Sequence, residues 1–202
     1  MNISYKNVKG SEAMKKKLNM ALIAIVVVIL VLGGVLFLNN QKAPRELDLA
    51  IDNFKLDEEY VYNGIPWGTA LEEVKKQLQV SIEKLDVPGT VGDASLVDYR
   101  TDTQFILDGK HTSSTTFKFQ GNKFVMASYV FTLDKYDEKW YNAQLEKLVE
   151  FYGEESNIAE NVAENFTAKT HRWDTEMTSL QWGNVVKSDG SAVVTLAVFY
   201  LY

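Results

Sequence analysis

The sequence predicts an α+β protein in which an N-terminal transmembrane helix is followed by an antiparallel sheet with two packed helices. Three observations predict it: one long apolar segment, two later stretches whose apolar residues recur at helical spacing, and six strand-like runs. After the apolar segment, the predicted order of elements is one helix, three strands, one helix and three strands. That order also fits two tandem units, residues 69–133 and 134–202.

The apolar segment covers residues 18–38, which are 21 uncharged residues, 15 of them Leu, Ile, Val or Phe. A helix of this length rises roughly 31 Å and matches a hydrocarbon core of about 30 Å. The segment is longer than the apolar region of a cleaved secretory signal, and no small-residue cleavage site follows it. We therefore expect an uncleaved signal-anchor in contact with the lipid bilayer, a cleaved signal being the alternative.

The basic residues around this segment predict its orientation. Three lysines, Lys15 to Lys17, stand directly before it, whereas only Lys42 and Arg45 follow closely. Because basic residues favour the cytoplasmic side, we expect the N-terminus inside and the C-terminal domain outside the cell membrane. The start at Met14 resembles a bacterial secretory start. The expected parts are a cytoplasmic tail (1–17), the anchor (18–38), a juxtamembrane spacer (39–58) and an extracytoplasmic domain (59–202).

Charge and composition exclude several classes of protein. Residues 1–38 hold five basic residues and one acidic residue, so the remaining chain has 16 basic and 26 acidic residues and a net charge of −10. An acidic domain repels phosphate backbones, which argues against nucleic acid as a partner. The chain has no cysteine, which excludes disulfide scaffolds, thiol enzymes and lipid attachment at a cysteine.

In the first half of the domain the sequence predicts one helix and three strands. Thr69 and Glu72 have the spacing of a capping box, and the apolar residues after them share one face of a helix over residues 70–79. Strand-like runs follow at 96–107, 112–120 and 123–133. The hairpin dipeptide Gly121-Asn122 joins the last two runs.

The second half repeats this order. Asp134 and Asp137 begin a helix that Gly153 ends, and Tyr141, Leu145, Leu148 and Tyr152 mark its apolar face. Strand-like runs follow at 166–174, 178–186 and 192–202. The last is apolar on both faces, so we expect a central or doubly covered strand. The segment 99–103 (YRTDT) recurs at 171–175 (HRWDT) with Arg, Asp and Thr in step.

The segment Gly64-Ile65-Pro66-Trp67-Gly68-Thr69-Ala70-Leu71-Glu72-Glu73-Val74 resembles the opening of small exported bacterial domains of the beta-lactamase inhibitor protein type, including the SmpA/OmlA lipoproteins. In those families a Gly-rich entry and a capped helix precede antiparallel strands. The resemblance implies a non-catalytic module that binds another protein on its sheet. This chain departs from the family pattern because it lacks the lipoprotein cysteine and shows one helix where the relatives open with two. Independently of the resemblance, Trp67 is expected to fill the gap between helix and sheet.

No catalytic, cofactor or metal-binding pattern is present in the sequence. His111 and His171 are the only histidines and lie 60 residues apart, and no metalloprotease, hydrolase, phosphate-binding or dinucleotide motif occurs. The match of Ser81 and Lys84 to S-x-x-K follows the end of the expected helix, where the lysine cannot activate the serine. We therefore predict that the protein is not an enzyme and uses neither cofactor nor metal.

The remaining chemical feature is a group of aromatic residues on expected strands. If an uncovered sheet face carries them, they form a protein-binding patch, because Trp and Tyr dominate interface hot spots; the alternative is that most belong to the core. The candidate binding residues are Tyr99, Tyr129, His171, Trp173 and Trp182.

We expect the chain to bind another extracytoplasmic or membrane protein, in envelope maintenance or as an inhibitor of an extracytoplasmic enzyme. The first alternative is a carbohydrate-binding or acid-residue hydrolase domain, which needs paired carboxylates in a cleft beside an exposed tryptophan. The second alternative is a structural subunit of a membrane complex.

Overall fold

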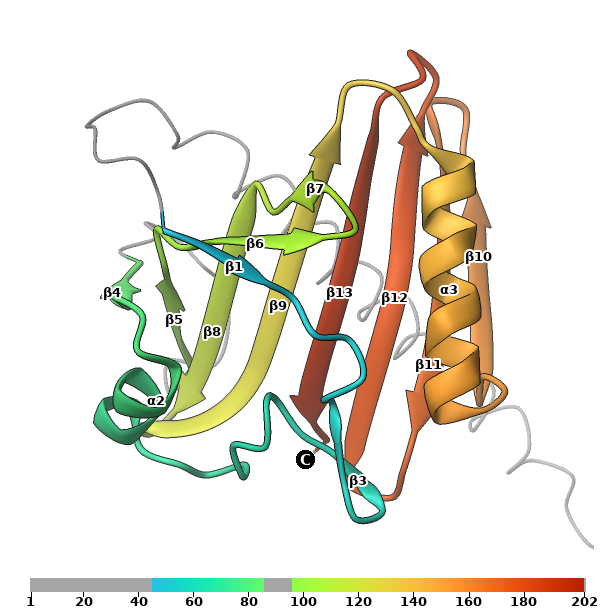
Figure 1. Ribbon diagram of the computed structural model, residues 1–202. Coiled ribbons are helices and arrows are strands. Elements are labelled where there is room, and N and C mark those ends of the chain that lie inside the picture. The colour runs from blue at the N-terminus through green and yellow to red at the C-terminus, as the bar shows by residue number, and fades with distance from the viewer. Residues whose placement is uncertain (1–44, 86–95, 202) are drawn as a thin grey trace, which may run out of the picture. The chain divides into compact units, whose positions relative to one another are not determined.

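The computed structural model describes residues 45–85 and 96–201, and within these residues its largest element is an antiparallel sheet of eight strands (Figure 1). The α+β class is therefore confirmed. Across the sheet the strands are β10 (Asn157–Val162), β11 (Phe166–Asp174), β12 (Thr178–Lys187), β13 (Ala192–Tyr200), β9 (Lys123–Leu133), β8 (Ser114–Gln120), β5 (Leu96–Arg100) and β4 (Glu83–Lys84).

A second layer covers one face of this sheet. Figure 1 shows that helix α3 (Glu138–Tyr152) and a smaller sheet both lie in front of the large sheet. In the smaller sheet, β1 (Glu46–Asp48) pairs in parallel with β6 (Gln104–Leu107), which pairs in turn with β7 (Lys110–His111). Helix α2 (Leu71–Leu78) and the hairpin of β2 (Lys55–Leu56) and β3 (Glu59–Tyr60) complete the described elements. The hydrophobic core lies between the layers.

The two halves of the large sheet have the same topology. In the first half, α2 precedes β4, β5, β8 and β9; in the second, α3 precedes β10, β11, β12 and β13. The halves meet where β9 and β13 pair antiparallel over eight residue pairs, from Met126↔Phe199 to Leu133↔Ala192. The recurring five-residue segments begin in equivalent strands, since Tyr99 lies in β5 and His171 lies in β11.

Several elements coincide with their predicted ranges. Strands β9 and β11 have the predicted bounds, and β13 lies between two neighbours with both faces buried, as its sequence indicates. Helix α3 begins after Asp137, whose carboxylate accepts a hydrogen bond from the backbone N–H of Trp140 at 3.0 Å. It ends at Gly153, which has a φ of 83° that favours glycine.

The predicted capping box of the first helix is wrong. The N-terminal cap of α2 is Ala70, and no side chain accepts a hydrogen bond there. The hydroxyl of Thr69 instead donates to the carbonyl oxygen of Pro66 at 2.7 Å, which closes the preceding turn. Trp67 lies as expected at the junction of this segment with the sheet. It is half-buried against Phe124 and donates its indole N–H to the carbonyl oxygen of Tyr60 at 2.7 Å.

Two predicted boundaries are also wrong. The expected strand 96–107 divides into β5 and β6, which belong to different sheets. Between them the backbone N–H of Thr103 donates to the buried hydroxyl of Thr101, and this local bond turns the chain out of the large sheet. The part of the expected spacer 39–58 that is described belongs to the domain, because β1 pairs with β6 and the next apolar residues are buried: Leu49, Ile51 and Phe54. The anchor 18–38 lies outside the described residues.

The burial of Trp182 predicts a large loss of stability on its truncation. Its ring is fully buried, stacks on Tyr141 at 5.2 Å and contacts Trp140 at 5.6 Å. Trp182→Ala should lower the free energy of unfolding by about 3–5 kcal/mol, because it leaves a cavity beneath α3. Urea unfolding measures this change. Val162→Ala is the control, since that exposed side chain should contribute less than about 0.5 kcal/mol; equal losses would contradict the packing.

Candidate functional site

The structure places four of the five predicted binding residues in the core. Tyr129, His171, Trp173 and Trp182 have exposed fractions of 3% or less, and Tyr99 is half-buried against Phe119. Trp173 also donates its indole N–H to the carbonyl oxygen of Gly153 at 2.7 Å. Side chains enclosed in this way cannot touch a partner that docks onto the domain. The expectation that an uncovered sheet face presents these four residues is therefore wrong.

Tyr129 lines a small cavity between the sheet and the segment that begins at β1. The cavity has a volume of about 150 Å³, and its walls include Leu49, Phe54, Val80 and Phe105. Burial raises the pKa of the Tyr129 hydroxyl well above its ordinary value, so this group is neutral at physiological pH. Ligand pockets usually measure roughly 300–1,000 Å³, so this cavity is too small to be the main candidate site.

The described residues bring together no recognisable catalytic constellation. Within residues 45–85 and 96–201, no group of three or more His, Asp or Glu side chains is placed to hold a metal ion. In the same ranges neither histidine forms a hydrogen bond with a serine or threonine hydroxyl, which a nucleophile and base pair requires. The remaining candidate is a binding surface.

Strand β10 is the feature that sequence reasoning missed. Among the described strands it pairs with β11 only, and it forms one edge of the large sheet. Ile158 and Val162 expose 53% and 71% of their surface, although apolar side chains in strands are usually covered. The opposite edge differs, because β4 has two residues whereas β10 has six. The described part of the sheet therefore has one long exposed edge.

The register shows which backbone groups of β10 face away from the sheet. The N–H of Ala163 donates to the carbonyl oxygen of Phe166, so these two residues form a hydrogen-bonded pair. The next pairs of the same register are Val162 with Thr167 and Asn161 with Ala168. Because pairing alternates along an antiparallel ladder, the N–H and C=O groups of Ile158, Glu160 and Val162 point outward from β11. Their side chains share one face, since the three residues are spaced by two.

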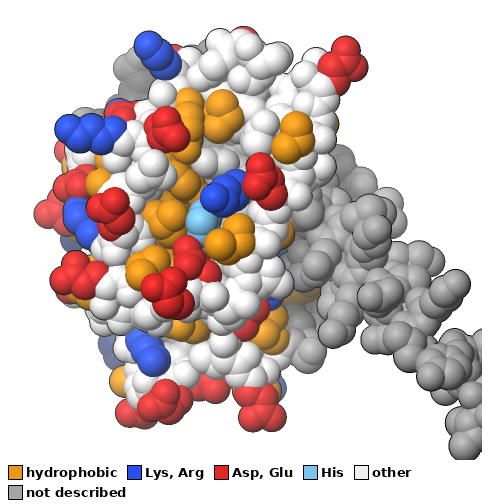
Figure 2. Space-filling view, turned by 90° about the vertical axis from the view of Figure 1, so that its right-hand side faces the viewer, with side chains coloured by type: hydrophobic (Ala, Val, Ile, Leu, Met, Phe, Trp, Pro, Cys, Tyr) orange, Lys and Arg blue, Asp and Glu red, His pale blue; other side chains and the backbone are white. Residues whose placement is uncertain are grey.

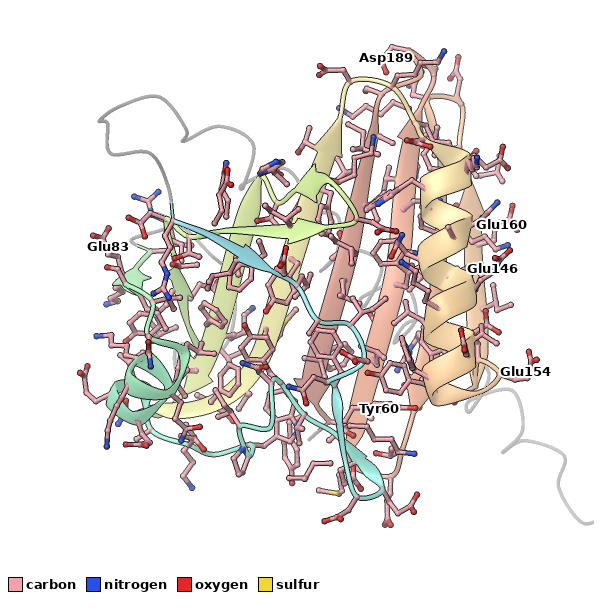
Figure 3. The ribbon with its side chains drawn as sticks, viewed as in Figure 1. Tyr60, Glu83, Glu146, Glu154, Glu160 and Asp189 are labelled. Atoms are coloured by element: carbon pink, nitrogen blue, oxygen red, sulfur yellow. The ribbon has the colours of Figure 1, made fainter. Side chains whose placement is uncertain are left out.

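The chain around this edge is strongly acidic. From Glu154 to Glu164 it contains four glutamates and no lysine or arginine. Figure 3 shows Glu146 on α3, Glu154 after it and Glu160 on β10 at this side of the domain. Figure 2 views the same side and shows hydrophobic side chains among acidic and a few basic ones. On β11, Lys169 lies opposite Glu160 and Arg172 lies opposite Asn157. We call the segment Glu154–Glu164 the β10 edge.

A buried histidine and carboxylate pair connects the β10 edge to the sheet. Nδ1 of His171 lies 2.7 Å from Oε1 of Glu155. Burial is the largest effect and lowers the pKa of His171. The Glu155 carboxylate raises this pKa and Lys169 lowers it, and the net shift is downward. The ring is therefore neutral at pH 7, and its carboxylate neighbour assigns the proton to Nδ1.

Comparisons with protein-family models, curated proteins and solved structures found no match. Neither α2 nor α3 has the length and apolar character that a bilayer-spanning helix needs, and the search covered the described residues only. The function must therefore be argued from the β10 edge itself.

The lowered pKa of His171 predicts a loss of stability in acid. The unfolded chain takes up a proton on this histidine at higher pH than the folded chain does, so acidification from about pH 7 to pH 5 should lower the free energy of unfolding. His171→Asn keeps an N–H donor for Glu155 but does not titrate in this range. The variant should lose less stability than the wild type between the two pH values. Identical pH dependences in chemical denaturation would contradict the assignment.

Proposed function

We propose that the chain is a membrane-anchored, extracytoplasmic protein-binding module whose docking surface is the β10 edge. The observation that carries the proposal is the long exposed edge strand with two exposed apolar residues, Ile158 and Val162. Exposed strand edges are ready templates for pairing with another chain, and folded proteins usually blunt or cover them. In the part of the chain that the structure describes, this edge is neither short nor covered, which favours a binding role.

The proposal includes the anchor 18–38 and a tandem origin of the domain. The apolar segment has the length of a transmembrane helix, and both halves of the large sheet follow the order of one helix and four strands. The resemblance of segment 64–74 to the beta-lactamase inhibitor protein type supports a protein partner, in envelope maintenance or in inhibition of an extracytoplasmic enzyme. A carbohydrate-binding role is less well supported, because all four tryptophans are buried or half-buried.

The proposed topology predicts protease sensitivity from outside the cell. The C-terminal domain should be degraded when protease is added to intact cells or, for a cell with an outer membrane, to spheroplasts. The reason is that residues 18–38 hold the N-terminus inside and the domain outside. An epitope tag placed after Tyr202 and followed by immunoblotting measures the loss, with a cytoplasmic protein as the control. Protection of the tag until the membrane is lysed would contradict the proposed orientation.

The proposed binding role predicts a position-dependent crosslink. A photoreactive amino acid at Val162 should give a crosslinked product with a second protein in living cells, because this exposed position lies on the β10 edge. The matched control carries the same amino acid at Glu83, which lies on the exposed opposite edge, β4. Gel mobility after irradiation is the measurement. The absence of any product at Val162, or equal products at both positions, would argue against the proposed docking surface.

A further inference from the structure

We propose that the β10 edge binds its partner by strand addition, taking an extended basic segment of a different protein as a ninth strand. The segment presents Lys or Arg opposite Glu160 and apolar side chains opposite Ile158 and Val162. This inference rests on the proposed protein-binding function and specifies the occupant of its docking surface.

The backbone geometry favours an extended partner. Ile158, Glu160 and Val162 direct their N–H and C=O groups away from β11, so three successive outward positions are available for antiparallel pairing. Their side chains lie on one face, as a face-specific partner strand requires. The residues between them on the other face carry no charge, being Ala159 and Asn161.

The charge of the segment selects the sign of the partner. Three exposed glutamates, Glu154, Glu160 and Glu164, and no basic residue lie between positions 154 and 164, and Glu160 stands midway between the two exposed apolar residues; the fourth glutamate, Glu155, faces His171. An opposite charge directly across two strands contributes about 0.2–1 kcal/mol, and a like charge is destabilising by a similar amount. A partner segment therefore complements this edge when it has a basic residue at its centre and an apolar residue two positions away on each side.

The same charge argues against a second copy of this chain as the occupant. Two β10 strands paired about a two-fold axis at Glu160 place one Glu160 opposite the other. Two segments with three exposed glutamates each also repel one another on approach. An extended segment from another protein avoids both costs.

A synthetic peptide tests the inference with the full-length protein. The probe is a nine-residue fluorescent peptide with lysine at its centre, valine two residues away on each side and threonine elsewhere. Fluorescence anisotropy should show binding that weakens at high salt, because exposed charges are screened. Replacing the lysine by glutamate should weaken binding by roughly fivefold to tenfold, which reflects a reversed cross-strand pair. Equal affinity of the lysine and glutamate peptides would overturn the charge assignment.

Backbone methylation and proline substitution separate strand addition from simple charge attraction. N-methylation of the peptide amides that would face β10 keeps its charge and side chains, so a strand-pairing peptide should lose binding by at least about tenfold. In the protein, Val162→Pro removes an N–H that points away from β11, whereas Val162→Ala keeps it. Thermal melting is expected to be the same for both variants. The alanine variant loses only the side-chain contact at position 162, so the proline variant, which also loses the backbone hydrogen bond, should bind the peptide more weakly than the alanine variant. Unchanged binding of the methylated peptide, or equal binding by both variants, would overturn strand addition.

The outcomes separate this inference from the proposed function. A crosslinked partner at position 162 that persists when Ile158→Pro is added would leave a protein-binding role intact and remove strand addition, because Ile158→Pro deletes another N–H that points away from β11. A dimer of the full-length chain that Val162→Pro abolishes would identify a second copy as the occupant and overturn the proposal. Failure of both the peptide and the crosslink would overturn the inference together with the proposed function.

Discussion

The pairing of β9 with β13 is the constraint on which the rest of the domain depends. It joins two sheets of four strands through the central strands, and β13 is buried on both faces along most of its length. Separately, the two halves would expose β9 and β13, both largely buried in the joined sheet, at their edges, which is an aggregation hazard. Joining the halves moves the exposed edges outward to β4 and β10. The position of the candidate docking strand is thus a consequence of how the core closes.

The sequence predicted those elements whose signals are local. Alternating apolar residues defined β9, and the side chains Asp137 and Gly153 marked the ends of α3. It did not predict the pairing of β1 with β6, because residues 46 to 48 form three pairs with residues 104 to 106 and have no period of their own. Pairing between segments so far apart in the sequence depends on tertiary packing, which cannot be predicted from the pattern of neighbouring residues.

The candidate site was missed for two different reasons. The aromatic residues lie on the predicted strands, and of the two alternatives the core is the correct one for four of the five. A signal for it existed, because Ser179, Gln181 and Gly183 alternate with Leu180 and Trp182 in β12. Both faces of β12 are buried from Thr178 to Asn184, but the large apolar side chains share one face, and this face packs against α3 as the core. Strand β10 has no comparable signal, because an edge strand with both faces accessible needs no apolar alternation.

Glu160 gives the β10 edge a combination of properties that apolar residues alone would not provide. Ile158 and Val162 without a charge between them would form an indiscriminate template for any exposed strand, including another copy. The glutamate penalises pairing with an acidic edge while it leaves the outward N–H and C=O groups accessible. Lys169 lies opposite Glu160 on the inner side, so the preference for a basic partner depends on the glutamates at both ends of the segment as well. Specificity here arises from repulsion of the wrong partner as much as from attraction of the right one.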